Sequence, residues 1–297
     1  ARTGTRWGRL QALKNHLIYA AVCALLALAD RLPRGLLLRA GRALGRSAHA
    51  LLGQSRQIAR RNLATACPEL NELQVNALTR RSFINAGENL TRTLLLRRAS
   101  FRARDHVHVA EDALDALAAA RAAGRGVVFV SAHLGPFEWL AAAIAEHGFR
   151  PVIVVRESYD RRLSRIVDQH RVARGIEVIH RGAPGADVAI VRALRSGRAV
   201  GFLPDLASRV RAVPTRWLGH LQPMPIGPSQ LALRLNSALM IGTLQPNLAG
   251  NGFKLRLEPL VVDPSKDMTQ SVANGLDRAI RGAAEHWLWM ARPLGES

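Results

Sequence analysis

The strongest constraint on the fold is a regular alternation of short apolar runs and helix-like segments between residues 110 and 205. The apolar runs cover residues 127–130, 151–155, 176–179 and 199–203, and helices are predicted over 111–123, 136–147, 160–174 and 186–196. A glycine directly follows each helical segment and favours its end there. Short apolar runs of this kind are typical of strands that are covered on both faces. The sequence therefore predicts an α/β fold with a mostly parallel central sheet and helices on both faces.

The rest of the chain is predicted to be helical before this region and mixed after it. Amphipathic helices are expected over 33–66, and a helical hairpin, broken near Gly87, over 69–98. After residue 205 we expect a loop over 206–226, a helix over 227–236, strands over 239–245 and 253–260 with a turn at 250–252, and a helix over about 268–291. We divide the chain into an apolar, basic N-terminal segment (1–30), an amphipathic helical region (31–109) and an α/β region (110–297), and expect 31–297 to form one compact domain.

The charge of the chain points to an anionic partner. Its 42 basic residues outnumber its 22 acidic ones, which gives a net charge of +20. A GC-rich genome would explain why arginines outnumber lysines by 39 to 3, but codon bias does not explain the shortage of acids. A phospholipid surface, a phosphorylated substrate, an acidic carrier protein or a nucleic acid would suit this charge. Nucleic acid is disfavoured because aromatics are only 5% of the chain, no binding motif is recognised and the arginines are dispersed.

Residues 17–29 form an apolar run of 13 residues near the N-terminus. As a helix the run would cover roughly 20 Å, which is short of the ~30 Å hydrocarbon core of a bilayer. Basic residues flank it on both sides, which argues against a cleaved signal peptide even though Ala27-Leu28-Ala29 resembles a cleavage site. We therefore predict a segment that dips into, or lies on, an anionic cytoplasmic leaflet. A buried core helix is the alternative.

A His-x4-Glu pair, His133 and Glu138, follows the apolar run 127–130. On one regular helix the two side chains would point about 140° apart, so a loop containing Gly135 is needed to bring them together. We expect His133 at the exit of a strand and Glu138 in the first turn of a helix, where the helix dipole favours a carboxylate. An imidazole made more basic by a carboxylate can remove a proton from an alcohol. Cys23 and Cys67 fit neither a disulfide framework nor a metal site, so a reduced protein without a metal is expected.

Arg156 and Asp205 also stand just past the ends of predicted strands. In open parallel sheets, binding and catalytic sites lie outside the carboxyl ends of the strands, so these side chains are expected near His133. Each candidate also has a purely structural explanation. His133 would be a satisfied core histidine, Glu138 a favourable first-turn acid, Arg156 a solvated arginine and Asp205 a turn residue after Pro204.

Further motifs accompany the His-x4-Glu pair in a fixed order. They are Arg60-Arg61-Asn62-Leu63, Cys67-Pro68-Glu69-Leu70, Val155-Arg156, Arg171, Leu203-Pro204-Asp205, Trp217-Leu218-Gly219, Pro225-Ile226-Gly227-Pro228, Trp287-Leu288-Trp289 and Arg292. Over residues 10 to 292, approximately, the chain thereby resembles the bacterial late acyltransferases of lipid A biosynthesis. These lauroyl and myristoyl transferases are a branch of the lysophospholipid and glycerol-phosphate acyltransferases.

The resemblance implies a membrane-associated O-acyltransferase at the cytoplasmic face of the bacterial inner membrane. Its donor would be a thioester of acyl carrier protein (acyl-ACP) or of coenzyme A (acyl-CoA), its acceptor a hydroxyl group of a lipid A-type glycolipid precursor, and it would need no metal and no cofactor. His133 would be the general base and Glu138 its partner, with Arg171 and Asp205 as further site residues. We expect Arg171 and Asp205 to form an ion pair, and Arg156 and Arg171 to bind phosphates of the acceptor or of the donor.

The chain departs from the pattern of this family at two places. The family commonly has Gly-Asn-Trp-Glu where this chain has Gly135-Pro136-Phe137-Glu138, and it often has Gln or His where this chain has Leu206. The acceptor therefore stays open, with a phosphatidylinositol mannoside, an aminolipid or a lysophospholipid as alternatives. A basic peripheral membrane protein without catalytic activity is a further alternative.

Overall fold

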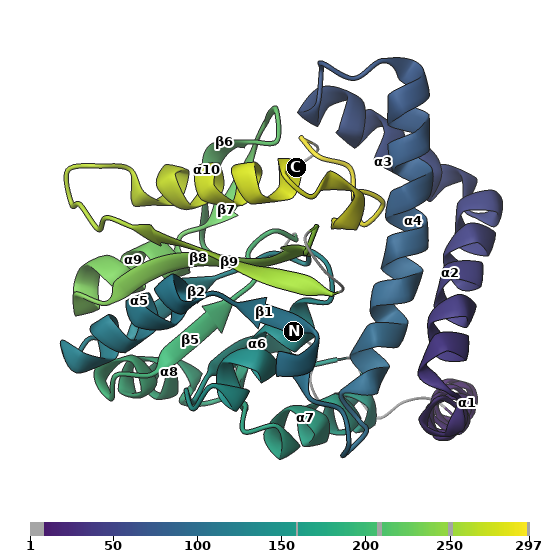
Figure 1. The fold of residues 1–297 in the computed structure, drawn as a ribbon, viewed down its shortest axis with the longest axis horizontal. Coiled ribbons are helices and arrows are strands. Elements are labelled where there is room, and N and C mark those ends of the chain that lie inside the picture. Colours follow the sequence, from purple (N-terminus) through teal and green to yellow (C-terminus); the bar gives the residue numbers. More distant parts are fainter. Residues whose placement is uncertain (1–8, 159, 207–209, 249–251, 296–297) are drawn as a thin grey trace.

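A computed structural model describes residues 9–158, 160–206, 210–248 and 252–295. Residues 1–8 of the predicted N-terminal segment and most of the predicted turn at 250–252 lie outside these ranges. The centre of the molecule is a seven-stranded sheet in the order β1-β9-β8-β2-β5-β3-β4 (Figure 1). Its strands are β1 (Val107–Val109), β2 (Val127–Val130), β3 (Val152–Arg156), β4 (Glu177–Arg181), β5 (Ala199–Phe202), β8 (Ala238–Pro246) and β9 (Phe253–Leu260). All neighbours pair in parallel except β8 and β9, which confirms the predicted mostly parallel sheet.

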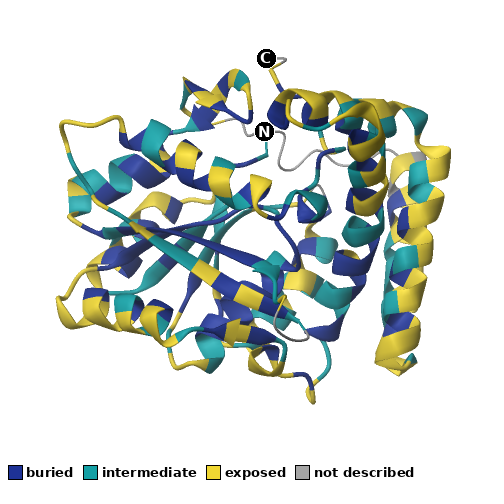
Figure 2. Ribbon diagram, turned by 45° about the horizontal axis from the view of Figure 1, so that its top comes forward, coloured by how far each residue is buried: buried dark blue, intermediate teal, exposed yellow. Residues whose placement is uncertain are grey.

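Helices cover both faces of this sheet, as the apolar runs predict. They are α5 (Glu111–Ala122), α6 (Phe137–Glu146), α7 (Arg161–Ala173), α8 (Ala186–Arg195), α9 (Gly227–Leu235) and α10 (Met268–Arg281). Successive side chains of a strand point to opposite faces, and β2 shows the result. Val128 and Val130 pack in the core formed with α8, α9 and α10, whereas Val127 and Phe129 pack in the core formed with α5 and α6. All four are buried, as the dark central strands of Figure 2 show.

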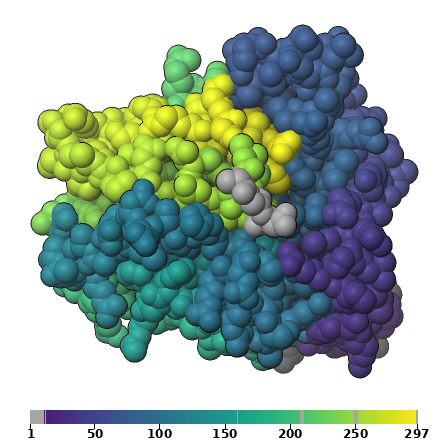
Figure 3. Space-filling model, in the orientation of Figure 1, coloured from purple at the N-terminus to yellow at the C-terminus, as the bar shows by residue number. Residues whose placement is uncertain are grey.

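Four N-terminal helices stand at one side of the sheet (Figures 1 and 3). They are α1 (Arg9–Arg31), α2 (Arg34–Leu51), α3 (Gly53–Ala66) and α4 (Glu72–Leu95). The predicted break of the chain near Gly87 is wrong, because α4 is continuous. A β-carbon at Gly87 would lie 2.3 Å from the carbonyl oxygen of Gly41 in α2. Gly87 therefore lets two helix backbones approach closely, and this packing outweighs its low helix propensity of about 1 kcal/mol.

Helix α1 contains the predicted apolar run but is longer than that run. At 23 residues it extends ~34 Å at 1.5 Å per residue, and residues 13–31 are long and apolar enough to cross a membrane. Only 11% of the residues in its apolar window are buried, which disfavours the buried core helix. Asp30 joins α1 to the rest of the protein through two hydrogen bonds of 3.0 Å from Arg97 at the end of α4. An apolar N-terminal helix of this kind fits a membrane-associating region.

Two predictions for the C-terminal third are wrong. The described part of the predicted loop at 206–226 contains a hairpin of β6 (Ala212–Trp217) and β7 (His220–Pro225). Its turn has positive φ at both Leu218 (48°) and Gly219 (79°), as a two-residue hairpin turn requires. The final helix ends at Arg281 instead of near 291, and a short 3₁₀ turn (Ala284–His286) follows. The chain leaves the helix so that the indoles of Trp287 and Trp289 lie in the core, with 1% and 0% exposure.

Candidate active site

A cavity of about 440 Å³ opens at the carboxyl ends of the parallel strands, where sites of such sheets are expected. Polar and charged side chains line part of its wall: Ser131, His133, Glu138, Arg156, Arg171 and Arg181. Apolar residues from β2, α6, β3, β5 and the region after β5 line the rest: Phe129, Phe137, Leu140, Ala141, Ile144, Pro151, Val152, Ile153, Val154, Val155, Ala199, Gly201, Leu203 and Leu206. We call this space the active-site cavity. It suits a ligand with one charged part and one long apolar part.

Asp205 holds His133 in place at this cavity. One carboxylate oxygen, Oδ1, lies 2.8 Å from His133 Nδ1, and the other, Oδ2, accepts a hydrogen bond of 2.8 Å from the backbone N–H of His133. The indole N–H of Trp287 also donates to Oδ2 at 2.8 Å. Asp205 is completely buried, while 24% of the His133 side chain is exposed. With Nδ1–H donating to Asp205, Nε2 of the neutral imidazole is the atom left to accept a proton.

The contact between His133 and Asp205 shifts the pKa of both side chains. Burial by itself lowers the pKa of His133, but the charge and the hydrogen bond of Asp205 outweigh it, Glu138 adds to them, and the pKa rises above its ordinary value of 6.5. Burial by itself raises the pKa of Asp205, but His133 and the hydrogen bond from Trp287 outweigh it and lower the pKa. Asp205 is therefore ionised near neutral pH, and His133 is a stronger base than a free histidine.

Glu138 forms a second ion pair in the wall of the active-site cavity. Arg171 donates to both of its oxygens, through Nη2 at 2.5 Å and Nε at 3.1 Å. Arg171 Nη1 also donates to Asp168 Oδ1 at 3.3 Å, and Asp168 Oδ2 lies 2.8 Å from Nε2 of His180. Burial by itself lowers the pKa of Arg171, but Glu138 and Asp168 outweigh it and raise the pKa. A two-pronged pair of this kind fixes both side chains.

The four charged or titratable site residues His133, Glu138, Arg171 and Asp205 pair differently in the structure from the pairing that the sequence predicts. We expected His133 to pair with Glu138 and Asp205 to pair with Arg171. Among the described residues, Asp205 instead pairs with His133 and Glu138 pairs with Arg171. Strand register explains the exchange: Val130 at the end of β2 is opposite Phe202 at the end of β5. Residues three positions beyond each strand end, His133 and Asp205, therefore lie side by side.

Arg156 lines the active-site cavity as expected, and a second arginine accompanies it. Arg156 at the end of β3 is the register partner of Arg181 at the end of β4, and both line the cavity. Arg181 was not among the predicted site residues, although it stands two residues past the apolar run 176–179, close to the position that made Arg156 a candidate. Trp287 was not among them either, and nothing in the local sequence places its indole against Asp205.

No group of three or more His, Cys, Asp or Glu side chains that could hold a metal ion occurs within the described ranges. The polar lining of the cavity consists of Ser131, His133 with Asp205 behind it, the Glu138–Arg171 pair, and the two further arginines Arg156 and Arg181. These groups can move a proton at His133 and attract an anionic ligand.

One family model matches the chain, that of the bacterial lipid A biosynthesis acyltransferases, and the match covers residues 8–294. It includes every residue of the active-site cavity and all of helix α1. No curated protein matches the chain.

Proposed function

The chain belongs to the bacterial lipid A biosynthesis acyltransferase family and is therefore an acyltransferase, and we propose that it transfers a fatty acyl chain from acyl-ACP or acyl-CoA to a hydroxyl group of a lipid A-type glycolipid precursor. The observation that carries this proposal is His133, held by Asp205, in the wall of a cavity that is lined largely by apolar side chains. Such a cavity accepts an acyl chain, and such a pair activates an alcohol.

In the proposed reaction, His133 is the general base. Its Nε2 takes the proton of the acceptor hydroxyl as the oxygen attacks the thioester carbonyl, which forms a tetrahedral intermediate. The intermediate then collapses to the new ester, and the departing thiolate takes the proton from the imidazolium. Asp205 keeps the imidazole oriented and stabilises its charged form. The first turn of α6 begins beside His133, whose ring contacts Phe137. We assign stabilisation of the oxyanion to the backbone N–H groups of Phe137 and Glu138, since that of Trp139 already donates to Pro136.

The two arginines at the strand ends are proposed to hold the polar part of a substrate. Arg156 and Arg181 present guanidinium groups at adjacent strand ends, and such groups bind phosphate oxygens well. The transferred acyl chain would extend over the apolar wall formed by Phe129, Leu140 and Ile144. Glu138 would act by holding Arg171 and by adding its charge near His133.

We further propose that the protein works at the cytoplasmic face of the inner membrane, with α1 in contact with the bilayer. The net charge of +20 suits an anionic leaflet, and the lipid acceptor would be found there. The same chemistry on another acceptor remains the alternative, and one observation favours it. Leu206, where the family often has Gln or His, lines the active-site cavity. The non-catalytic alternative is disfavoured by the family assignment.

Acyl transfer measured with purified protein tests the proposal. The protein is incubated in detergent micelles with an acyl thioester and a purified lipid A precursor, and both free thiol and acylated lipid are measured. We expect turnover that depends on both substrates. His133→Ala should lose roughly 10²–10⁴-fold in kcat, the range for removal of a general base, with an unchanged circular dichroism spectrum.

Two results would count against parts of this proposal. Near-normal turnover of His133→Ala would exclude the general base. Transfer to a lysophospholipid or an aminolipid in place of the lipid A precursor would change the acceptor. Mass spectrometry of membrane lipids from cells with and without the gene checks the acceptor independently.

A further inference from the structure

A second cavity, of about 270 Å³, lies between α1, α4 and α7. We call it the α1 cavity. Most of its wall is aliphatic: Val22, Leu26, Leu94, Leu96, Leu163, Ile166, Val167 and Ile176. Residues from three helices, from the loop after α4 and from the position before β4 thus converge on one apolar space. An apolar space of this shape favours an apolar ligand.

The charged groups in the wall of the α1 cavity already have partners within the protein. Arg97 binds Asp30 through two hydrogen bonds and also contacts His170. Burial, with the charge of Arg97 added to it, lowers the pKa of His170, so this ring is neutral near pH 7. Arg171 is paired with Glu138. The wall therefore has little charge to offer a polar ligand.

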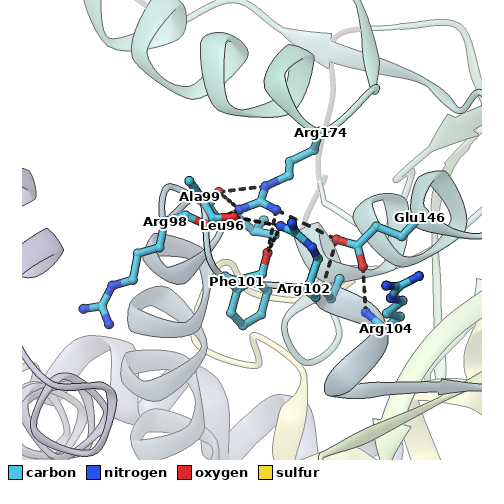
Figure 4. Close-up of polar contacts among 9 residues, drawn as sticks. Leu96, Arg98, Ala99, Phe101, Arg102, Arg104, Glu146 and Arg174 are labelled. Atoms are coloured by element: carbon cyan, nitrogen blue, oxygen red, sulfur yellow. Dashed lines mark hydrogen bonds and ion pairs between the residues drawn. The ribbon is translucent and has the colours of Figure 1, made fainter.

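Arg174, directly after α7, lines this cavity and binds the loop after α4 (Figure 4). Its guanidinium donates to the backbone carbonyl groups of Leu96, at 2.9 and 3.0 Å, of Arg98, at 2.5 Å, and of Phe101, at 2.6 Å. The carboxylate of Glu146 accepts the backbone N–H groups of residues 103 and 104 in the same loop. The loop after α4 is thereby fixed to α6 and α7, which holds this part of the cavity wall in place.

The α1 cavity adjoins the active-site cavity. Glu138 and Arg171 line both spaces, so their ion pair is a wall common to the two. On its other side the α1 cavity is bounded by α1, the one helix in the described part of the chain that is apolar and long enough to cross a membrane. A ligand in the α1 cavity would thus touch the membrane helix on one side and lie next to the reacting groups on the other.

We propose that the α1 cavity binds an acyl chain of the membrane lipid that acts as acceptor, while the transferred chain occupies the active-site cavity. This inference rests on the proposed function. An acceptor that keeps one chain against α1 can bring its hydroxyl group to His133 without leaving the bilayer completely. Bound in this way, the acceptor is positioned for reaction by contacts remote from the reacting atoms.

Matched tryptophan substitutions on α7 test the inference. Val167 lines the α1 cavity and is 41% exposed, whereas Val172, on the same helix, is 62% exposed and does not line it. Both sites are exposed enough to accept an indole, so folding should survive. Val167→Trp should raise the KM for a long-chain lipid A precursor about tenfold, the effect of losing burial of roughly two methylene groups. Val172→Trp should leave it unchanged.

A second pair on α1 repeats the test from the opposite wall. Leu26 lines the α1 cavity, and its neighbour Leu25 is 64% exposed and does not. Leu26→Trp should raise the KM for the acceptor, and Leu25→Trp should not. In both cavity variants the KM for the acyl thioester should stay constant. The penalty should also shrink with an acceptor of the same headgroup and shortened chains, because such an acceptor reaches less far into the cavity.

The outcomes separate this inference from the proposed function. If the wild-type protein transfers acyl groups but Val167→Trp and Val172→Trp have equal KM values for the acceptor, the inference is wrong and the proposed function stands. If the cavity variants instead change the preferred chain length of the thioester, the α1 cavity holds the transferred chain and the inference is again wrong. A wild-type protein without acyl transfer to the lipid A precursor would overturn both.

Discussion

Asp205 sets the proton affinity of His133, and this contact determines how activity should depend on pH. In the proposed reaction the base form of His133 takes the proton of the acceptor hydroxyl, and Asp205 raises the pKa of the imidazole above 6.5. We therefore expect kcat/KM to increase with pH through an apparent pKa above 6.5. Asp205→Asn removes the negative charge that raises the pKa of His133, while the burial that lowers this pKa stays. In this variant the rise of kcat/KM with pH should therefore occur at lower pH, and kcat at the plateau should fall roughly 10²-fold or more.

Rate measurements between about pH 5 and 9 follow this limb, with thermal unfolding of Asp205→Asn as the control for folding. A purely structural Asp205 would reduce the amount of active protein but leave the apparent pKa in place. A limb that stays in place in the folded variant would show that another group sets the proton affinity of His133.

At the scale of single residues, the sequence predicted which side chains belong near the site better than it predicted how they pair. His133, Glu138, Arg156 and Arg171 line one cavity, and Asp205 lies directly behind it. Their pairing depends on which strands are neighbours. Since β2 lies beside β5, His133 meets Asp205, and this neighbour relation is not written in any local pattern. Arg181 also stands just past a predicted strand, so it could have been predicted on the same ground as Arg156.

At the scale of elements, α1 is expected to be separable from the rest of the protein. Its apolar window is 11% buried, so little core is lost when it is removed. Deleting residues 1–30 should shift most of the protein to the soluble fraction, with a cooperative thermal transition retained. The remaining basic surface should still bind anionic vesicles weakly and wash off with salt.

Cell fractionation, circular dichroism and vesicle sedimentation measure these three properties. Loss of the thermal transition on deletion would show that α1 is needed as a core helix. A truncated protein that stays in the membrane fraction at high salt would place the membrane contact elsewhere in the chain.

Local sequence signals correctly predicted the helices that end at glycines and the strands between them. They failed where contacts between distant elements determine the local structure. The strands and helices between residues 110 and 205 lie close to their predicted positions. Gly87 was misleading because it serves a helix–helix contact. The β6–β7 hairpin was not predicted because Pro214, Pro223 and Pro225 suggest a loop. Its two-residue turn nevertheless has the positive φ angles of a hairpin.

At the scale of the whole molecule, the C-terminal tail joins the N-terminal helices to the active site. Asn62 of α3 donates to the carbonyl oxygens of Trp289 and Arg292, both at 2.8 Å, and accepts from the backbone N–H of Leu294 at 3.0 Å. At the other end of the tail, Trp287 donates to Asp205. Asn62 and its partners are more than 200 positions apart in the sequence, so local patterns could not predict these contacts.

His286 lies at this junction, and its backbone oxygen accepts the N–H of Gly135 in the loop after His133. Its side chain is 8% exposed. Burial, with the charge of Arg92 added to it, lowers the pKa of His286 to about 4. The unfolded chain therefore binds a proton at this site between about pH 6.5 and 4 that the folded chain does not. The folded state is favoured above pH 6.5, and this contribution is lost as the pH falls toward 4.

His286→Phe should remove this pH dependence and keep the ring contact with Phe253, whose centroid lies 5.7 Å away. Between pH 7 and 4 the wild-type protein should lose on the order of 3 kcal/mol more unfolding free energy than the variant. Denaturant unfolding at several pH values measures the difference, in which the titration of other groups cancels. Parallel curves for the two proteins would show that His286 can be protonated in the folded state. Because the tail also carries Trp287 to Asp205, the wild-type protein should lose activity at a higher pH than His286→Phe does as the pH falls.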